Sequence, residues 1–192
     1  MRTLASAVSS GDDRAEVVLE VVHGAMIASV RSLLAVVFAL AAVAPAFAAP
    51  AAPGFRVKVL DSGRTFDSRE MMGKKVVVLR FQASYCKACA RESAAFGRLA
   101  EGYADRGVEF LALHVQDTVA DTRRFLRAQH VTYPVALDPK LTVGNRYGFQ
   151  GTPYTVVIDR KGEIAARIIG ASAPTRLPRI LDDLLGQRAP KA

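Results

Sequence analysis

The sequence predicts an α/β domain with a mixed central sheet and helices on both faces. Three observations lead to this class. Short apolar runs alternate with segments of helical period, two of the runs are apolar almost throughout, and the last two are joined by a tight turn at residues 160–162. Apolar runs with few polar positions are typical of strands covered on both faces. The tight turn predicts an antiparallel pair, so the sheet is expected to be mixed.

The first half of the domain contains three expected strands and one long helix. Residues 55–60 and 65–66 predict two short strands, with an Asp-Ser-Gly turn between them. Residues 76–81 predict a buried strand, which we place at the centre of the sheet. From Cys86 the apolar positions recur at helical spacing, and Gly107 is the expected C-terminal cap of this helix.

The second half continues the alternation. We expect strands at residues 108–115, 133–137, 154–159 and 163–169, and helices at residues 120–129, 141–147 and 174–185. The last two strands form the hairpin. The last helix is amphipathic. Its expected inward residues are Leu177, Ile180, Leu181 and Leu184, and its expected outward residues are Arg179, Asp182 and Asp183.

Length and composition fit one globular domain that can bury its own core. The chain has 192 residues, of which 51% are hydrophobic and 23% charged, and this excludes disorder, collagen and coiled coil. The formal net charge is +8, yet basic residues run no longer than pairs such as Lys74-Lys75. This pattern favours acidic partners or an anionic membrane, and we expect no nucleic-acid partner.

The N-terminal segment predicts export. Residues 33–44 form a 12-residue apolar run, preceded by Arg31 and followed by Ala-Phe-Ala at residues 46–48. This pattern is typical of a secretory signal peptide, here residues 26–48, with cleavage after Ala48 and a periplasmic destination. The alternative is an uncleaved anchor that leaves the domain membrane-associated and facing the periplasm. Pro45 and the Ala-rich composition make the segment a poor spanning helix.

The remaining boundaries follow from charge and composition. Residues 1–25 are acidic where a signal peptide is basic, so Met26 is the alternative start and the extension is then not translated. Residues 49–54 are rich in Pro and predict a linker, residues 55–187 the domain, and residues 188–192 a tail. From residue 49 onward, 23 basic and 14 acidic residues give 23 − 14 = +9.

Two cysteines, Cys86 and Cys89, lie where the buried strand gives way to the long helix. Free N–H groups and the dipole at a helix N-terminus stabilise an anion, so Cys86 is expected to favour the thiolate that attacks disulfides. Cys89 lies one turn further on the same face, where it can close a ring with Cys86 and release a mixed disulfide. Lys87 either adds positive charge beside the thiolate or is a solvated surface lysine.

Other uses of a Cys-x-x-Cys pair are a zinc half-site, a structural disulfide and a copper site. A structural zinc site needs four ligands, and the spacing of His114 and His130 does not match a zinc finger. A disulfide across so short a loop stabilises a fold little. A copper chaperone would use Cys86 and Cys89 as soft ligands for Cu(I), with His114 as a third. Redox exchange with protein thiols and disulfides is the use we favour.

Two motifs resemble thioredoxin-like proteins. Residues 81–89 read FQASYCKAC, which is similar to the family's FWAxWCxxC, and residues 151–153 read Gly-Thr-Pro, which is similar to its Gly-x-Pro. The resemblance implies a thioredoxin-like fold, a redox-active Cys86–Cys89 disulfide and a cis peptide bond before Pro153. It also implies that Thr152, Pro153 and Tyr85 bind substrate. Gln82 and Tyr85 stand where the family has tryptophans.

The TlpA/ResA-type exported thiol:disulfide oxidoreductases are the most similar branch, because one helix–strand unit is inserted before the Gly-Thr-Pro loop. Glu92 follows Cys89 by three residues, where these proteins carry an acidic residue. It is either a proton acceptor for Cys89 or a plain surface glutamate. Arg80 stands where thioredoxin has a buried Asp. The sequence leaves two orientations of its side chain open, one toward the interior and one away from it.

The resemblance implies an exported reductant that needs no bound cofactor or metal. Its electrons would come from a membrane donor, and its pathway would be cytochrome c maturation or the assembly of a copper site. A thiol peroxidase of the peroxiredoxin type is a weaker reading. That class expects Pro and Thr at seven and three residues before its cysteine, where this chain has Leu79 and Ala83.

Overall fold

The structure is a computed structural model that describes residues 49–186. The expected extension, the signal peptide with its cleavage site, residue 187 and the tail lie outside the described residues. Among residues 49–186, no helix is both long enough and apolar enough to cross a membrane.

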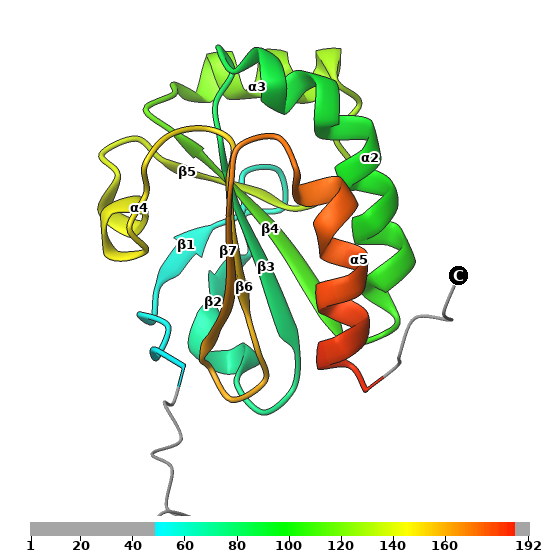
Figure 1. The fold of residues 1–192 in the computed structure, drawn as a ribbon. Coiled ribbons are helices and arrows are strands. Elements are labelled where there is room, and N and C mark those ends of the chain that lie inside the picture. Colours follow the sequence, from blue (N-terminus) through cyan, green and yellow to red (C-terminus); the bar gives the residue numbers. More distant parts are fainter. Residues whose placement is uncertain (1–48, 187–192) are drawn as a thin grey trace, which may run out of the picture. The chain divides into compact units, whose positions relative to one another are not determined.

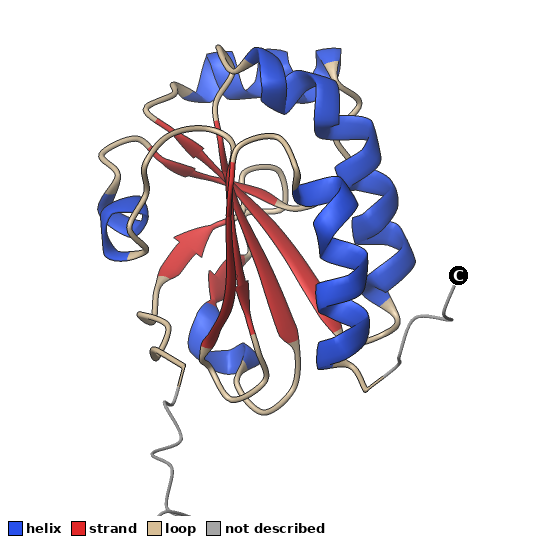
Figure 2. Ribbon diagram, viewed as in Figure 1, coloured by secondary structure: helices blue, strands red, loops and turns tan. Residues whose placement is uncertain are grey.

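The described chain contains one central sheet, a small hairpin and helices (Figures 1 and 2). The strands are β1 (Arg56–Lys58), β2 (Thr65–Asp67), β3 (Val76–Gln82), β4 (Val108–Val115), β5 (Val135–Asp138), β6 (Tyr154–Ile158) and β7 (Ile164–Ile169). The helices are the 3₁₀ turn η1 (Ser68–Met71), α2 (Lys87–Ala104), α3 (Val119–Ala128), α4 (Thr142–Arg146) and α5 (Ala173–Leu184). Each predicted element is present within a few residues of its expected bounds, and η1 was not predicted.

The sheet is mixed, as predicted. Its strand order is β5-β4-β3-β6-β7. β3 pairs in parallel with β4 and antiparallel with β6, and the hairpin β6–β7 continues the antiparallel half. β3 is the central strand, and all seven of its residues are buried, which explains its nearly continuous apolar sequence.

Side chains from the two faces of the sheet form two cores. Helices α2 and α5 cover one face, where Phe96, Leu177 and Leu181 pack on the strands. On the other face, Phe66 next to β1 and Tyr147 after α4 belong to the second core. Figure 1 shows α2 and α5 side by side on one face, and α3 across the end of the sheet.

Contacts between distant segments hold the start of the described chain and correct one expectation. Within residues 49–54, Ala51 bridges to Glu163 and the N–H of Ala52 donates to the carbonyl of Gly162 at 2.8 Å. Asp182 was expected to face outward. Instead its carboxylate accepts hydrogen bonds from the Tyr103 hydroxyl at 3.0 Å and from Arg106 at 2.6 Å, and it joins α5 to α2.

The parallel half of the sheet positions the loops that matter for function. The carboxyl ends of β3 and β4 lie at one end of the sheet, since Gln82 pairs with His114 in register. The loops that follow both strands therefore meet there, and the cysteine pair is in the first of them. The antiparallel β6 starts at the same end, because its first residue Tyr154 pairs with Phe81.

Candidate active site

Cys86 and Cys89 form a disulfide at the N-terminus of α2, with 5.2 Å between their Cα atoms. Cys86 is the N-cap residue, and its Sγ accepts a hydrogen bond from the N–H of Cys89 at 3.0 Å. Cys86 is 7% exposed and Cys89 is fully buried. An incoming substrate therefore reaches Cys86 first, and a backbone N–H is already aimed at its sulfur, where it would stabilise a thiolate.

The loop before Cys86 is held by one buried carboxylate. Asp117, from the loop after β4, accepts hydrogen bonds from the N–H and the hydroxyl of Ser84, both at 2.7 Å. The next residue, Tyr85, is 61% exposed, and its hydroxyl approaches Gln116 at 3.5 Å. The carboxylate holds the backbone two residues before Cys86, while the adjacent aromatic ring of Tyr85 stays on the surface.

The central strand β3 carries a buried cation that reaches the active-site helix. Arg80 is fully buried, so its side chain points inward, and its Nη2 donates to Oε2 of Glu92 at 2.9 Å. The guanidinium also lies over the Phe96 ring, 4.6 Å from its centroid. The side chain of Glu92 is 12% exposed. Glu92 is therefore a largely buried, paired carboxylate rather than a plain surface glutamate.

A chain of hydrogen bonds runs from Arg80 to the loop that holds Ser84. Nε of Arg80 donates to Oε1 of Gln82 at 3.2 Å, and Nε2 of Gln82 meets Nε2 of His114 at 2.8 Å. Nδ1 of His114 lies 2.7 Å from Asp117. Within the described chain, Glu92 on the active-site helix is thus connected through side chains to Ser84 on the active-site loop.

The direction of this chain fixes the state of His114. Oε1 of Gln82 accepts from Arg80 and from the Tyr133 hydroxyl at 3.3 Å, so its amide group donates to Nε2 of the imidazole. Nε2 is then the acceptor and Nδ1–H donates to Asp117, which makes His114 neutral. Burial lowers the pKa of His114, and the Asp117 carboxylate opposes that shift. Both ring nitrogens are occupied, so His114 offers no free nitrogen as a third ligand for copper.

The second motif lies at the same end of the sheet. The Thr152–Pro153 peptide bond is cis, as the resemblance implied. The carbonyl of Pro153 accepts from the N–H of Gly170 at 2.9 Å. Pro153 directly precedes Tyr154, which pairs with Phe81, so the loop lies next to the end of β3 from which the chain leads to Cys86. Thr152 is partly exposed, and Pro153 is buried.

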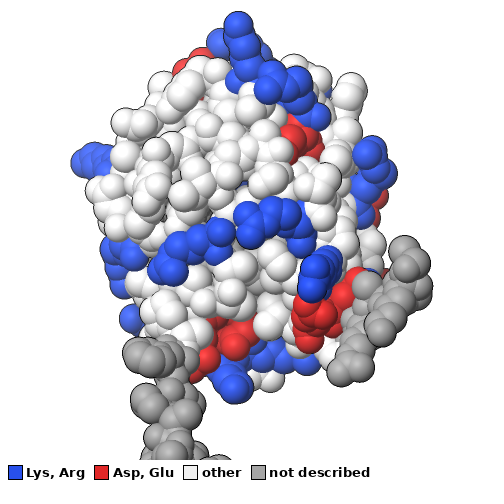
Figure 3. Space-filling view, in the orientation of Figure 1, with Lys and Arg blue, Asp and Glu red and all other residues white. Residues whose placement is uncertain are grey.

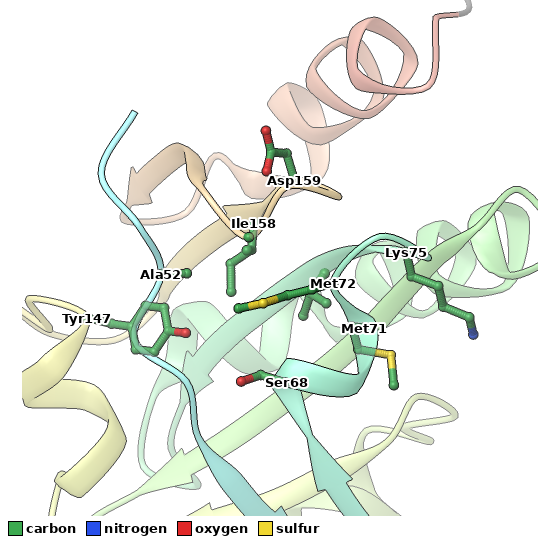
Figure 4. A pocket seen from close by; sticks show the side chains of 10 residues that line it. Ala52, Ser68, Met71, Met72, Lys75, Tyr147, Ile158 and Asp159 are labelled. Atoms are coloured by element: carbon green, nitrogen blue, oxygen red, sulfur yellow. The ribbon is translucent and has the colours of Figure 1, made fainter. Parts of the chain in front are cut away.

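A small pocket at the opposite end of the sheet has no part in the site. It is lined by residues that include Met71, Met72 and Ile158, and its cavity of about 10 Å³ has room for about one water. Figure 4 shows Met72 reaching across it between Ile158 and Ser68. Among residues 49–186, no group of three or more His, Cys, Asp or Glu side chains is arranged to hold a metal ion.

Three residues of the site were not predicted from the sequence as a connected set. Gln82, His114 and Asp117 link the active-site strand to the active-site loop. The available signal was polarity, because Arg80, Gln82 and His114 interrupt otherwise apolar strands and are all fully buried. Buried polar groups need hydrogen-bond partners, so polar residues at buried positions of neighbouring strands are expected to bond to one another. Asp117 carries no comparable signal, since it lies in a polar loop.

Comparisons with known proteins agree with this geometry. Residues 43–167 match the AhpC/TSA family. The chain is 30% identical to the thiol-disulfide oxidoreductase ResA of Bacillus thuringiensis (strain Al Hakam) over 126 residues, which is 66% of this chain and 72% of that one. It is also 30% identical to ResA of Geobacillus thermodenitrificans (strain NG80-2) over 133 residues, 69% of this chain and 75% of that one.

Solved structures give the same result for the fold. A thiol:disulfide interchange protein of the thioredoxin family from Chlorobium tepidum TLS superposes with a TM-score of 0.64 at 25% sequence identity. The superposition covers 72% of this chain and 97% of that one. The predicted thioredoxin-like fold is confirmed.

Proposed function

The chain belongs to the AhpC/TSA family and is a thiol:disulfide oxidoreductase, and on this premise we propose that it is an exported reductant of protein disulfides. The observation that carries the proposal is the Cys86–Cys89 disulfide at a helix N-terminus, with the first cysteine the more exposed. A pair placed in this way has an accessible attacking sulfur and a protected resolving sulfur.

The proposed cycle transfers two electrons. The thiolate of Cys86 attacks one sulfur of a client disulfide, the client S–S bond breaks, and the released client thiolate takes a proton. Cys89 then loses its proton and attacks Sγ of Cys86, which releases the second client sulfur as a thiol and forms the Cys86–Cys89 disulfide. The client is reduced and this protein is oxidised. A membrane-bound dithiol donor would reduce the pair again.

We assign Glu92 as the proton acceptor for Cys89. It follows Cys89 by one helical turn, and its carboxylate is held in place by Arg80. A carboxylate at this distance along a helix lies on the same face as the residue three positions before it. Thr152, Pro153 and Tyr85 are the proposed substrate contacts, because Tyr85 directly precedes Cys86 and the cis-proline loop starts the strand that pairs with the end of β3.

The client pathway is proposed on the resemblance alone, as cytochrome c maturation or the assembly of a copper site. Two oxidised peptides distinguish these pathways. One carries Cys-x-x-Cys-His, the attachment sequence of c-type haem, and the other carries the cysteine pair of a copper site. Faster reduction of the first peptide by the purified protein would assign haem attachment, and faster reduction of the second would assign copper-site assembly.

Export is tested separately from chemistry. The full chain is fused after residue 192 to a reporter enzyme that folds only in an oxidising compartment, and the exported product is sequenced from its N-terminus. We expect an active reporter and a product that begins at Ala49. An inactive reporter would contradict export, and an active one on an unprocessed chain would indicate the membrane anchor. Peptides from residues 1–25 in the precursor would contradict a start at Met26.

The peroxidase function receives no support from the site. Leu79 and Ala83 stand where a peroxiredoxin needs Pro and Thr, and both are buried side chains without a hydroxyl group. A peroxidase needs such a donor beside its cysteine to polarise the peroxide. A rate of peroxide reduction equal to the rate of peptide disulfide reduction would contradict our assignment.

A further inference from the structure

A groove with a volume of about 270 Å³ opens beside the disulfide, between the start of α2 and helix α3. It is lined by the active-site loop and by both helices. Six of its lining residues carry the argument: Tyr85, Ala90, Asp121, Arg124, Phe125 and Ala128. No residue of the cis-proline loop lines it, so the groove extends the site in another direction from Cys86.

The groove has an apolar part and an exposed aromatic ring, and the rest of its lining is polar: Ser84, Asp121, Arg124 and Gln129. Ala90, Phe125 and Ala128 present small or aromatic side chains to it, and Tyr85 stands at the end next to Cys86 with 61% of its surface exposed. Because Tyr85 directly precedes Cys86, an apolar side chain in the groove would lie on the same client segment as the attacked sulfur. A Tyr side chain supplies a large contact area at a low cost in conformational entropy.

Positive charge lies next to this groove on both helices. Lys87 and Arg91 are exposed on one face of the first turns of α2, outside the groove lining, and Arg124 is exposed on α3 and lines the groove. Asp121 is already paired with Arg124 at 3.0 Å and accepts from Thr118. No ion pair of Lys87 or Arg91 is present within residues 49–186. Lys and Arg side chains gather at the end of the molecule where α3 lies (Figure 3).

We propose that this groove binds a client segment that places an apolar side chain next to the attacked cysteine and acidic side chains on either side. The inference rests on the proposed function and names its substrate class. The acidic groups would meet Lys87, Arg91 and Arg124, and the apolar group would meet Phe125. Exposed ion pairs contribute little to stability, but complementary charge speeds the encounter of two molecules and is screened by salt.

The test uses three oxidised peptides that share one disulfide. The first has Leu beside the cysteine and Glu on both sides, the second has Lys in place of Glu, and the third has Gly in place of Leu. We measure the second-order rate at which the reduced protein reacts with each. The acidic peptide is expected to react about 10-fold faster than the basic one at low salt, and this ratio falls toward one at high salt.

Charge-reversal variants assign the effect to the groove. Arg91→Glu with Arg124→Glu should abolish or invert the acidic-to-basic ratio. A matched variant, Arg176→Glu with Arg179→Glu, makes the same change in net charge on exposed positions of α5, which does not line the groove. It should leave the ratio unchanged. An equal loss in both variants would overturn the proposal, because net charge alone would then explain the preference.

The remaining outcomes separate this proposal from the one it rests on. Reaction with both charged peptides at equal rates would overturn the docking surface alone. Reaction with neither would overturn the proposed function as well. A rate unaffected by the change of Leu to Gly would overturn insertion of an apolar side chain. A dimer in sedimentation that Arg91→Glu with Arg124→Glu dissociates would assign the groove to a second copy of this chain instead.

Discussion

Arg80 donates from Nη2 to Oε2 of Glu92 at 2.9 Å, so a fully buried cation in the central strand holds the carboxylate that follows Cys89 by one helical turn. This ion pair joins strand β3 to helix α2, one helical turn after Cys89. Removing one partner leaves the other charge buried without compensation, which costs more than the pair contributes. Arg80 and Glu92 therefore connect the stability of the fold with the proposed proton transfer from Cys89.

A double-mutant cycle tests how strongly Arg80 and Glu92 are coupled in the stability of the protein. Arg80→Met alone should lower the free energy of unfolding by roughly 3 kcal/mol, because it leaves the Glu92 carboxylate largely buried and unpaired. Glu92→Gln alone should also destabilise the protein. The double variant should lose less than the sum of the two single losses. Chemical denaturation measures all four proteins, and strictly additive losses would contradict a coupled pair.

The role of Glu92 in the chemistry is tested on separate steps. Glu92→Gln should slow the release of the second client sulfur by about 10²-fold, because a positioned base contributes factors of this size to proton transfer. The first step, attack by Cys86, should keep its rate. Rapid quenching with mass spectrometry distinguishes the mixed disulfide from the released product. A purely structural role would slow both steps alike or neither.

Replacing each cysteine should block a different step of the exchange reaction. Cys86→Ser should abolish exchange with a peptide disulfide, since the accessible sulfur is lost. Cys89→Ser should still attack and then remain as a mixed disulfide between Cys86 and the client. Mass spectrometry of the intact protein reports the added client mass. Normal turnover by Cys89→Ser would show that another group resolves the intermediate.

The buried imidazole predicts a pH dependence of stability. Burial lowers the pKa of His114 below its usual 6.5, so the unfolded chain binds a proton at a pH where the folded chain does not. The contribution of neutral His114 to the free energy of unfolding is then fully present above about pH 6.5. It is lost as the pH falls from there toward the pKa of His114 in the folded protein. The slope from one such group is at most about 1.4 kcal/mol per pH unit.

Matched variants isolate this contribution. His114→Asn should flatten the dependence of the unfolding free energy on pH in that window. His130→Asn is the control, because His130 is exposed and its φ of 48° lies in the left-handed region that Asn tolerates. Denaturant titrations between pH 5 and pH 8 measure the slopes. A His114→Asn slope equal to that of the wild type would mean that the imidazole does not titrate in this way.

Much of the fold was predictable because it follows local patterns. The run at residues 108–115 has the bounds of β4, and the change to helical spacing near Cys86 marks the start of α2. The cysteine motif and the Gly-Thr-Pro motif are both local, and each identifies its part of the site by itself. Residues adjacent in sequence are what a pattern reports best.

The remaining features depend on partners that are distant in sequence. Ser84 and Asp117 are 33 residues apart, and nothing in either loop indicates the other. Asp182 was placed outward by helical period, but two helices in contact bury a wider arc than one apolar stripe, and Tyr103 and Arg106 occupy the added width. The bridge from Ala51 to Glu163 uses backbone groups, on which composition gives no information.

The most direct test of the account is the reduction potential of the Cys86–Cys89 disulfide, measured by equilibrating the purified protein with glutathione. The account predicts a potential near that of thioredoxin, about −270 mV, as expected of a reductant. A potential near about −120 mV would contradict it, because such a pair donates disulfides instead of reducing them.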